Sequence, residues 1–164
     1  MQKVFSIILL TSVLTGCVFF QHQHQHQHQK QIIGATEVIE IVDANLSFKA
    51  RVDTGAKTCS IHAEDINVDS SEENPKGKPI SFRIVNKNGQ SRQINTRVAS
   101  SVTVNTAEGK ERRYTVPLTV KWHDSEKTIL FTLNDRLTME YYLLLGRNWL
   151  RGSFLVDVEK NSDD

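Results

Sequence analysis

The sequence predicts an all-β domain that carries one short helix near its C-terminus. Apolar and polar residues alternate in short segments from Gln31 onward, turn-forming residues separate these segments, and only one short stretch is typical of a helix. Short strands at such spacing are characteristic of a barrel or sandwich. With 164 residues, the chain is long enough for one domain with a substantial core and too short for two.

The elements follow from the alternation and the turn signals. Strands are expected at 35–42, 46–53, 80–85, 101–106, 114–122 and 128–135. Turns are expected at 43–45, 86–89, 107–109 and 123–126, where Asn, Asp, Gly and Ser gather. The polar stretch 68–78 contains Pro75 and Gly77, which predicts an exposed loop. The helix is expected at 147–151, after the apolar run 141–145 and Gly146.

The N-terminus has the features of an export signal. A short basic segment precedes the apolar residues 4–14, which are too few to span a bilayer as a stable helix. The following Leu-Thr-Gly-Cys (14–17) resembles the lipobox of bacterial lipoproteins. This resemblance implies that 1–16 is a signal peptide and that Cys17 is lipidated. An ordinary signal peptide or a short anchor is the alternative.

Val18, rather than Asp, follows the cysteine, which favours the outer membrane over the inner one. We therefore expect a lipid-anchored protein of the bacterial cell envelope that faces the periplasm.

Residues 17–31 form the expected tether, in which His22, His24, His26 and His28 alternate with glutamines. Such a run cannot build a packed core, so it is interpreted as a flexible spacer. Loose collection of Zn²⁺, Cu²⁺ or Ni²⁺ is the alternative, but no fixed geometry holds the imidazoles together, and we assign no metal site. The folded domain is expected at 32–160, followed by a polar tail at 161–164.

Charge and cysteine content exclude further classes. A formal net charge of +1 argues against a nucleic-acid partner. If Cys17 is lipidated, Cys59 is the remaining thiol and no intrachain disulfide can form. Cys59 is expected to be a small buried residue rather than a nucleophile.

Two motifs together carry the functional signal. Asp53-Thr54-Gly55 follows a strand, where glycine permits a sharp turn, and Leu-Leu-Leu-Gly-Arg-Asn-Trp-Leu (143–150) comes much later. An Asp-Thr-Gly turn alone is weak evidence. The pair resembles the retropepsins, single-domain aspartic peptidases typified by retroviral proteases. It is most similar to the bacterial retropepsin-like group that carries the label ATP-dependent zinc protease.

The resemblance implies a retropepsin-like acid-protease barrel with Asp53 as the catalytic residue. Thr54, Gly55 and Ala56 would support the active-site loop, and Gly146, Arg147 and Asn148 would form the second motif of the fold. Aspartic peptidases need two facing carboxylates that share a proton and hold a water. This chain has one Asp-Thr-Gly, so the second Asp53 is expected from another copy in a homodimer.

The hairpin 101–112, with Ala107, Glu108 and Gly109 at its tip, is the expected substrate-covering flap. An ordinary surface hairpin is the alternative, and the hairpin 80–97 is expected to be an additional element.

The sequence contains no motif that would support the zinc binding or the ATP binding named in the group's label. No Gly-rich loop followed by Lys-Ser/Thr is present, and neither is His-Glu-x-x-His. Cys59 and His62 lie three apart on an expected strand, so they point to opposite faces. We therefore expect no cofactor and no metal.

Lys57 is the main departure from the retroviral pattern, which has an acidic residue here that pairs with the arginine of Gly-Arg-Asn. One interpretation is that Glu64, Asp65 or Asp157 pairs with Arg147 and that Lys57 is solvated. The other is a cleft that binds acidic peptides, because several cations could meet substrate carboxylates. Those cations are Lys57, Arg51, Arg147, Arg112 and Arg113. Relatives of the group are associated with glutamate-adding ligases and poly-glutamate tails, which favours acidic substrates.

The function expected from these features is a homodimeric, membrane-tethered aspartic endopeptidase that acts on peptides, with acidic or glutamate-rich peptides as candidate substrates. The alternative is a non-catalytic binding module of the same fold in a cell-envelope assembly.

Overall fold

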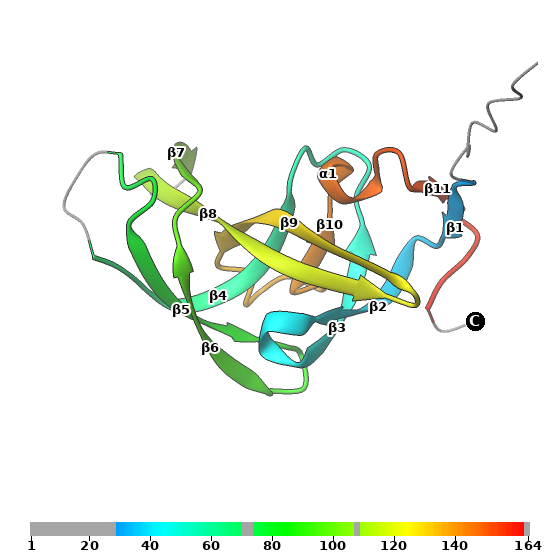
Figure 1. Ribbon diagram of the computed structural model, residues 1–164, viewed down its shortest axis with the longest axis horizontal. Coiled ribbons are helices and arrows are strands. Elements are labelled where there is room, and N and C mark those ends of the chain that lie inside the picture. The colour runs from blue at the N-terminus through cyan, green and yellow to red at the C-terminus, as the bar shows by residue number, and fades with distance from the viewer. Residues whose placement is uncertain (1–28, 70–73, 107–108, 163–164) are drawn as a thin grey trace, which may run out of the picture.

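The computed structural model describes residues 29–69, 74–106 and 109–162 (Figure 1). The expected signal peptide, Cys17 and the four alternating histidines lie outside these ranges, as do Ala107 and Glu108 at the expected flap tip. Within the described ranges, no helix is both long and apolar enough to cross a membrane.

Strands account for nearly all the regular structure. In chain order the elements are β1 (Gln31–Ile33), β2 (Thr36–Ile41), the 3-10 turn η1 (Val42–Ala44), β3 (Leu46–Val52), β4 (Cys59–Val68), β5 (Pro79–Val85), β6 (Ser91–Arg97), β7 (Ser100–Thr106), β8 (Gly109–Trp122), β9 (Ser125–Asn134), β10 (Leu143–Leu145), α1 (Arg147–Leu150) and β11 (Phe154–Val156). The all-β prediction is confirmed, and the short helix ends within one residue of its expected position.

Six strands close a barrel in the order β10, β3, β2, β8, β9 and β4, and β4 returns to β10. The short β10 is parallel to β3, with Leu143 opposite Ala50, and antiparallel to β4, with Leu143 opposite Ile61. Consequently the loop 53–58, which joins β3 to β4, passes around the C-terminal end of β10.

The core is filled by the inward-facing residues of the strands, which alternate with outward-facing ones along each strand. Along β3, Leu46, Phe48, Ala50 and Val52 are buried, whereas the residues between them face outward, because successive side chains of a strand point to opposite faces. Trp149 of α1 is fully buried and stacks on Phe154 with ring centroids 5.1 Å apart. The helix is therefore anchored against the barrel by apolar packing.

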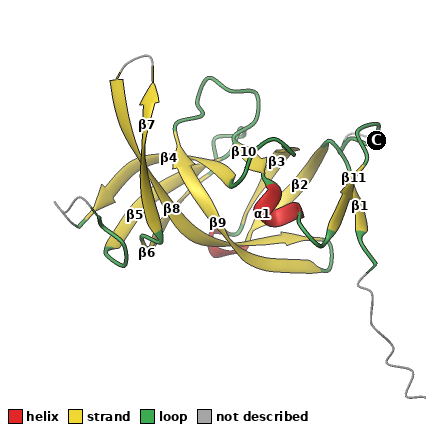
Figure 2. Ribbon diagram, turned by 90° about the horizontal axis from the view of Figure 1, so that it is seen from above, coloured by secondary structure: helices red, strands yellow, loops and turns green. Residues whose placement is uncertain are grey.

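Two hairpins extend from the barrel. β5 and β6 continue the sheet from β4, where the sequence predicts the additional hairpin. β7 pairs with the first half of β8, from Thr106 opposite Gly109 to Ser100 opposite Thr115, and this hairpin projects from the body (Figure 2). The expected flap hairpin and the expected strand 114–122 therefore share one continuous strand, β8.

The pairing of β1 with β11 was not predicted from the sequence. These two strands of three residues lie parallel, with Ile32 opposite Leu155, beside the barrel (Figure 1). Ile33 and Phe154 are buried, whereas Ile32 and Leu155 are more than half exposed. The ribbon joins the two ends of the folded domain.

Candidate active site

Asp53 is fixed by backbone groups at the mouth of the barrel. Its own N–H donates to the carbonyl of Leu145, the last residue of β10, at 2.9 Å. The N–H groups of Gly55 and Ala56 donate to Asp53 Oδ1 at 2.9 and 3.1 Å. Within the described ranges Oδ2 accepts no hydrogen bond, and the residue is half-buried. The loop therefore holds one carboxylate oxygen and leaves the other available.

Gly146 allows the two motifs to touch. A Cβ at this position would lie 2.7 Å from the Thr58 carbonyl carbon, 2.8 Å from its oxygen and 3.0 Å from the Cys59 nitrogen. Real Cβ atoms essentially never lie closer than 3.0 Å to such atoms, so a side chain here would force the backbone of Thr58 to move. The glycine is required by the close approach of the chain that follows the Asp53 loop, and the Gly146 N–H donates to Cys59 Sγ at 3.2 Å.

Arg147 binds the Asp53 loop through carbonyl oxygens. Its Nη1 donates to the carbonyls of Thr54 at 3.1 Å and Gly55 at 2.6 Å, and its backbone N–H donates to the carbonyl of Ala56 at 2.9 Å. A guanidinium presents several donors in a rigid plane, which suits such a loop. Arg147 thus stabilises the turn that presents Asp53.

The acidic partners considered for Arg147 from the sequence are bound elsewhere. Glu64 and Asp65 both pair with Arg83, at 2.6 and 2.9 Å. Asp157 accepts a hydrogen bond from the backbone of Glu159 at 3.1 Å. The prediction that one of these three acids pairs with Arg147 is wrong, because backbone carbonyls take the place of the carboxylate.

Asn148 links the loop to the barrel wall. Its Oδ1 accepts the N–H of Cys59 at 2.9 Å, and its Nδ2 donates to the carbonyl of Leu130 on β9 at 2.8 Å. The three residues of Gly-Arg-Asn therefore each contact the segment that follows Asp53 in a different way: by close approach, by capping carbonyls and by bridging strands.

Cys59 is fully buried beside this motif. Burial raises the pKa of its thiol to about 12, although the hydrogen bond from Gly146 opposes the shift. Reactive cysteines are thiolates at ambient pH, so Cys59 has the properties of a structural residue.

We therefore expect Cys59 to be unreactive in the folded protein. In the full chain with Cys17→Ser, where it is the remaining thiol, labelling by a maleimide at pH 8 should be at least about 100-fold slower than in the urea-unfolded chain, since the thiolate fraction and access are both reduced. Equal labelling rates in the two states would contradict the burial described here.

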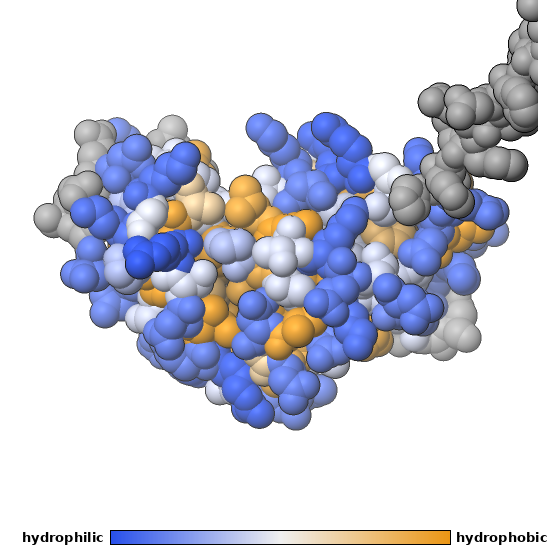
Figure 3. Space-filling view, viewed as in Figure 1, coloured by the Kyte–Doolittle hydropathy of each residue, from blue (hydrophilic) through white to orange (hydrophobic). Residues whose placement is uncertain are grey.

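Lys57 is exposed and makes no hydrogen bond or ion pair with the rest of the described chain. It lines a pocket of about 420 Å³ whose other walls are mostly neutral. These walls are Thr58, Ser100, Thr115, Ile129, Leu130 and Asn148. Figure 3 shows the surface hollowed between the β7–β8 side and the region of α1, with apolar residues on its floor. Lys57 therefore places a positive charge at one edge of this hollow.

The other expected cations lie on two strands. Arg51 is exposed on β3, opposite Leu144 of β10, and its Cζ lies 6.0 Å from the centre of the Tyr141 ring. Arg113 of β8 pairs with Glu111 at 3.0 Å. Arg112, the next residue toward the hairpin tip, is exposed and has an interaction of its own. Among these three strand arginines, Arg51 is the one whose guanidinium makes no hydrogen bond to another described residue.

Arg136 was not predicted from the sequence. Burial lowers the pKa of its guanidinium, the charge of Asp53 opposes this shift, and Arg113 adds to it. Arg136 therefore lies within electrostatic range of both residues. The signal that could have found it is a basic residue in the short segment between the last long strand and the apolar run 141–145.

The described residues contain no group of three or more His, Cys, Asp or Glu side chains placed to hold a metal ion. His62 is buried and binds Glu64 and the backbone of Arg136 rather than Cys59.

Comparison with known proteins places this geometry in a family. The sequence pattern of the family described as "RimB-like: Retropepsin-like aspartic endopeptidase RimB" matches residues 32–162. The chain belongs to the RimB-like family. The retropepsin-like barrel expected from the sequence is confirmed, and the match spans both motifs around Asp53 and Gly146.

The curated relatives that match this chain are much longer than it and are named as ligases. A probable alpha-L-glutamate ligase of Shewanella pealeana is 34% identical over 121 residues, which cover 70% of this chain and 25% of that protein. One from Parasynechococcus marenigrum is 34% identical over 136 residues, covering 79% of this chain and 28% of that protein. The chain thus spans about a quarter of the curated relatives that it matches.

A solved structure has nearly the same extent as the domain. The protein Lpg0085 of Legionella pneumophila, of unknown function (DUF785), superposes with a TM-score of 0.67 at 28% identity, covering 81% of this chain and 97% of that one. The shared fold therefore accounts for nearly all of that solved chain.

Proposed function

We propose that this chain is an aspartic endopeptidase whose active site is a dyad of two Asp53 residues, one from each copy in a homodimer. The observation that carries the proposal is the geometry of Asp53: backbone N–H groups hold Oδ1, while Oδ2 stays available in a loop clamped by Arg147. Such a platform presents one carboxylate rigidly at the mouth of the barrel.

In this mechanism the two carboxylates share one proton, since like charges so close together cannot both ionise. The ionised carboxylate accepts a proton from a water held between the two residues, and that water attacks the scissile carbonyl carbon. The protonated carboxyl donates a hydrogen bond to the carbonyl oxygen. Collapse of the tetrahedral intermediate transfers a proton to the departing amine and breaks the C–N bond.

The homodimer is a requirement of this chemistry. The sequence contains one Asp-Thr-Gly, so the second carboxylate has to come from a second copy across a two-fold axis. Thr54 and Gly55 are exposed in the single chain, which leaves this side of the loop free to face another copy.

Acidic peptides are the proposed substrates. Lys57 lines the pocket beside the Asp53 loop, and Arg51 lies two residues before Asp53; neither forms a hydrogen bond or an ion pair within the part of the chain that the structure describes. Charge-assisted hydrogen bonds from such groups favour carboxylate side chains. The names of the curated relatives refer to glutamate, which supports glutamate-rich peptides among the candidates.

The N-terminal motif supports a location in the cell envelope, with the domain held at the membrane by lipidated Cys17. The expected flap, with Gly109 at its described edge, would cover a peptide that lies in the hollow. Fractionation of cells that carry Cys17→Ser tests the anchor directly.

Mixed dimers test the dyad. When wild-type and Asp53→Asn chains are co-expressed in equal amounts, about one quarter of the dimers are wild-type pairs. Cleavage of a glutamate-rich peptide per total chain should therefore fall to about 25% of the wild-type value, because a mixed pair lacks one carboxylate. A decrease to about 50% would mean that each chain works alone. A wild-type chain that binds peptides without cleaving them would support the non-catalytic alternative.

A further inference from the structure

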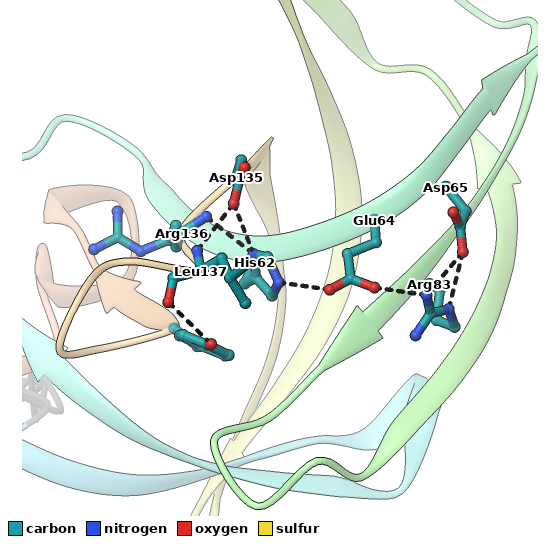
Figure 4. A network of polar contacts seen from close by, with 8 residues as sticks. His62, Glu64, Asp65, Arg83, Asp135, Arg136 and Leu137 are labelled. Carbon is teal, nitrogen blue, oxygen red and sulfur yellow. Dashed lines mark hydrogen bonds and ion pairs between the residues drawn. The ribbon is translucent and has the colours of Figure 1, made fainter.

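His62 is a buried histidine that links β4 to the segment between β9 and β10. It is 1% exposed, and its ring lies 4.6 Å from the ring of Tyr142, directly before β10. The Arg136 backbone N–H donates to His62 Nδ1 at 2.9 Å, and Nε2 lies 3.1 Å from Glu64 Oε1. Figure 4 shows the imidazole between these two partners, so both of its nitrogens are engaged.

These two contacts fix the protonation of the imidazole. A backbone N–H can only donate, so Nδ1 has to be the unprotonated nitrogen of the His62 ring. Nε2 then carries the hydrogen and donates to the Glu64 carboxylate. The arrangement is consequently that of a neutral histidine in one defined tautomer.

Glu64 is held in place from its far side. Its Oε2 lies 2.6 Å from Arg83 Nη2, and the same nitrogen lies 2.9 Å from Asp65 Oδ2. Because this guanidinium fixes the Glu64 carboxylate, His62 Nε2 keeps the same partner whether the ring is neutral or charged. The change in hydrogen bonding that protonation causes is therefore confined to Nδ1.

A second acceptor lies close to Nδ1. Asp135 Oδ1 is 3.7 Å from His62 Nδ1, and the Asp135 side chain is 80% exposed. Its present hydrogen bond comes from the Leu137 N–H, at 2.9 Å. A hydrogen on Nδ1 would prevent that nitrogen from accepting the Arg136 N–H and would allow it to donate to Asp135. The neutral ring and the charged ring thus bind different groups of the same turn.

The turn 135–139 has few other contacts that fix its position. Within it, the Met139 N–H donates to the Arg136 carbonyl at 2.9 Å. Leu137 and Met139 are at least half exposed, so apolar burial contributes little to holding the turn against the barrel. The chain continues from here into β10, the strand whose last carbonyl accepts the Asp53 N–H.

Titratable and charged groups face His62 from several elements. Glu64 comes from β4 itself, and Asp135 comes from the turn after β9. Tyr142 packs on the ring, and Lys87 of the turn 86–89 lies 4.2 Å from the centre of the Tyr142 ring. Among these residue types, histidine is the one whose charge ordinarily changes between pH 5 and 8. A pH response of this cluster in that range is therefore assigned to the imidazole.

We propose that His62 is a pH-sensitive switch that holds the turn 135–139 at neutral pH and releases it when the imidazole takes up a proton as the pH falls from 8 to 5. In the neutral state Nδ1 binds the Arg136 N–H. In the protonated state Nδ1–H binds Asp135, and the Arg136 N–H is released from the ring. The inference goes beyond the proposed function, because the switch needs no substrate, and it makes the chain that enters β10 sensitive to pH.

Amide hydrogen exchange measured by NMR on the full chain tests the switch. Protection factors, which divide the intrinsic exchange rate by the observed one, remove the direct effect of pH on the exchange chemistry. The protection factor of the Arg136 amide should fall by about tenfold between pH 8 and 5, the loss expected for one hydrogen bond. The amides of β3 should not show this fall. No change at Arg136, or an equal fall in β3, would overturn the proposal.

Two substitutions separate His62 from other titrating groups. His62→Asn places an amide oxygen where Nδ1 lies and does not titrate, so the Arg136 amide should keep its protection within about twofold over the same pH range. His123→Asn is the matched control, because His123 is exposed and has φ +49°, a conformation that asparagine adopts readily. A tenfold fall with His62→Asn, or no fall with His123→Asn, would contradict the assignment to His62.

Asp135→Asn tests the exchange of partners even if His62→Asn does not fold, because Asp135 is mostly exposed. Loss of this carboxylate should move the midpoint of the Arg136 response to lower pH by about 0.2–0.7 unit, which is what an exposed ion pair contributes. An unchanged midpoint would overturn the proposed partner. None of these measurements uses a substrate, so a failed switch leaves the proposed dyad standing, and an inactive protein leaves the switch standing.

Discussion

Asp53→Asn is expected to lower kcat for peptide cleavage by about 10⁴-fold, the upper end of what general acid–base catalysis contributes, because the change removes both carboxylates of the proposed dyad. Asparagine has the same shape, and its Oδ1 can still accept the N–H groups of Gly55 and Ala56 that hold Asp53 Oδ1. The fold should therefore be retained. Steady-state kinetics on a glutamate-rich peptide measure the effect.

Thermal unfolding supplies the control for this result. The Tm of Asp53→Asn should stay within about 3 °C of the wild type, since no contact in the core changes. Asp124→Asn, in an exposed turn, changes the same charge away from the loop and should leave kcat unaltered. Cleavage by Asp53→Asn at the wild-type rate would exclude the aspartic mechanism.

Gly146→Ala is expected to lower the stability more than any other substitution near the site that adds a single methyl group. Its backbone has φ −87°, which alanine adopts freely, so the cost comes from space alone. The added methyl would lie 2.7 Å from a backbone carbon of Thr58. Overpacking of this kind costs about 1–3 kcal/mol, which lowers Tm by about 4–12 °C in a domain of this size.

Gly152→Ala at the other end of α1 is the comparison. Gly152 has φ +81° and open space around it, so its replacement strains the backbone by about 1–2 kcal/mol without displacing a neighbour. Both variants should unfold at lower temperature, but only Gly146→Ala should also reduce kcat, because the Asp53 loop has to move. A Gly146→Ala protein with wild-type Tm and kcat would contradict the close approach.

Local patterns determined much of the fold. The outward and inward residues of β3 could be assigned from their alternation because one face of that strand is buried in the barrel and the other is not. The turn 43–45 and the end of the apolar run at Gly146 depend on residues that act on their immediate neighbours. For the same reason, the β3 strand and the turn at Asp53 were correctly placed from the sequence.

Contacts between segments that are distant in the chain could not be predicted from the sequence. β1 and β11 have three residues each and are stable as strands only because the folded barrel brings them together. The partners of Arg147 could not be predicted from the sequence. They are the backbone carbonyls of Thr54 and Gly55, and every residue has such a carbonyl, so no residue type marks them.

The sequence by itself therefore determined an all-β domain and the Asp53 carboxylate on a turn, together with the glycine and arginine that could support it. Only the tertiary structure decided what surrounds that carboxylate. The Leu145 carbonyl and the Arg147 side chain reach the Asp53 loop because β10 lies between β3 and β4 in the closed barrel. No periodic pattern encodes this meeting, because hydrophobic burial specifies which face of a strand is inside and leaves the neighbours of each outward charge to the topology.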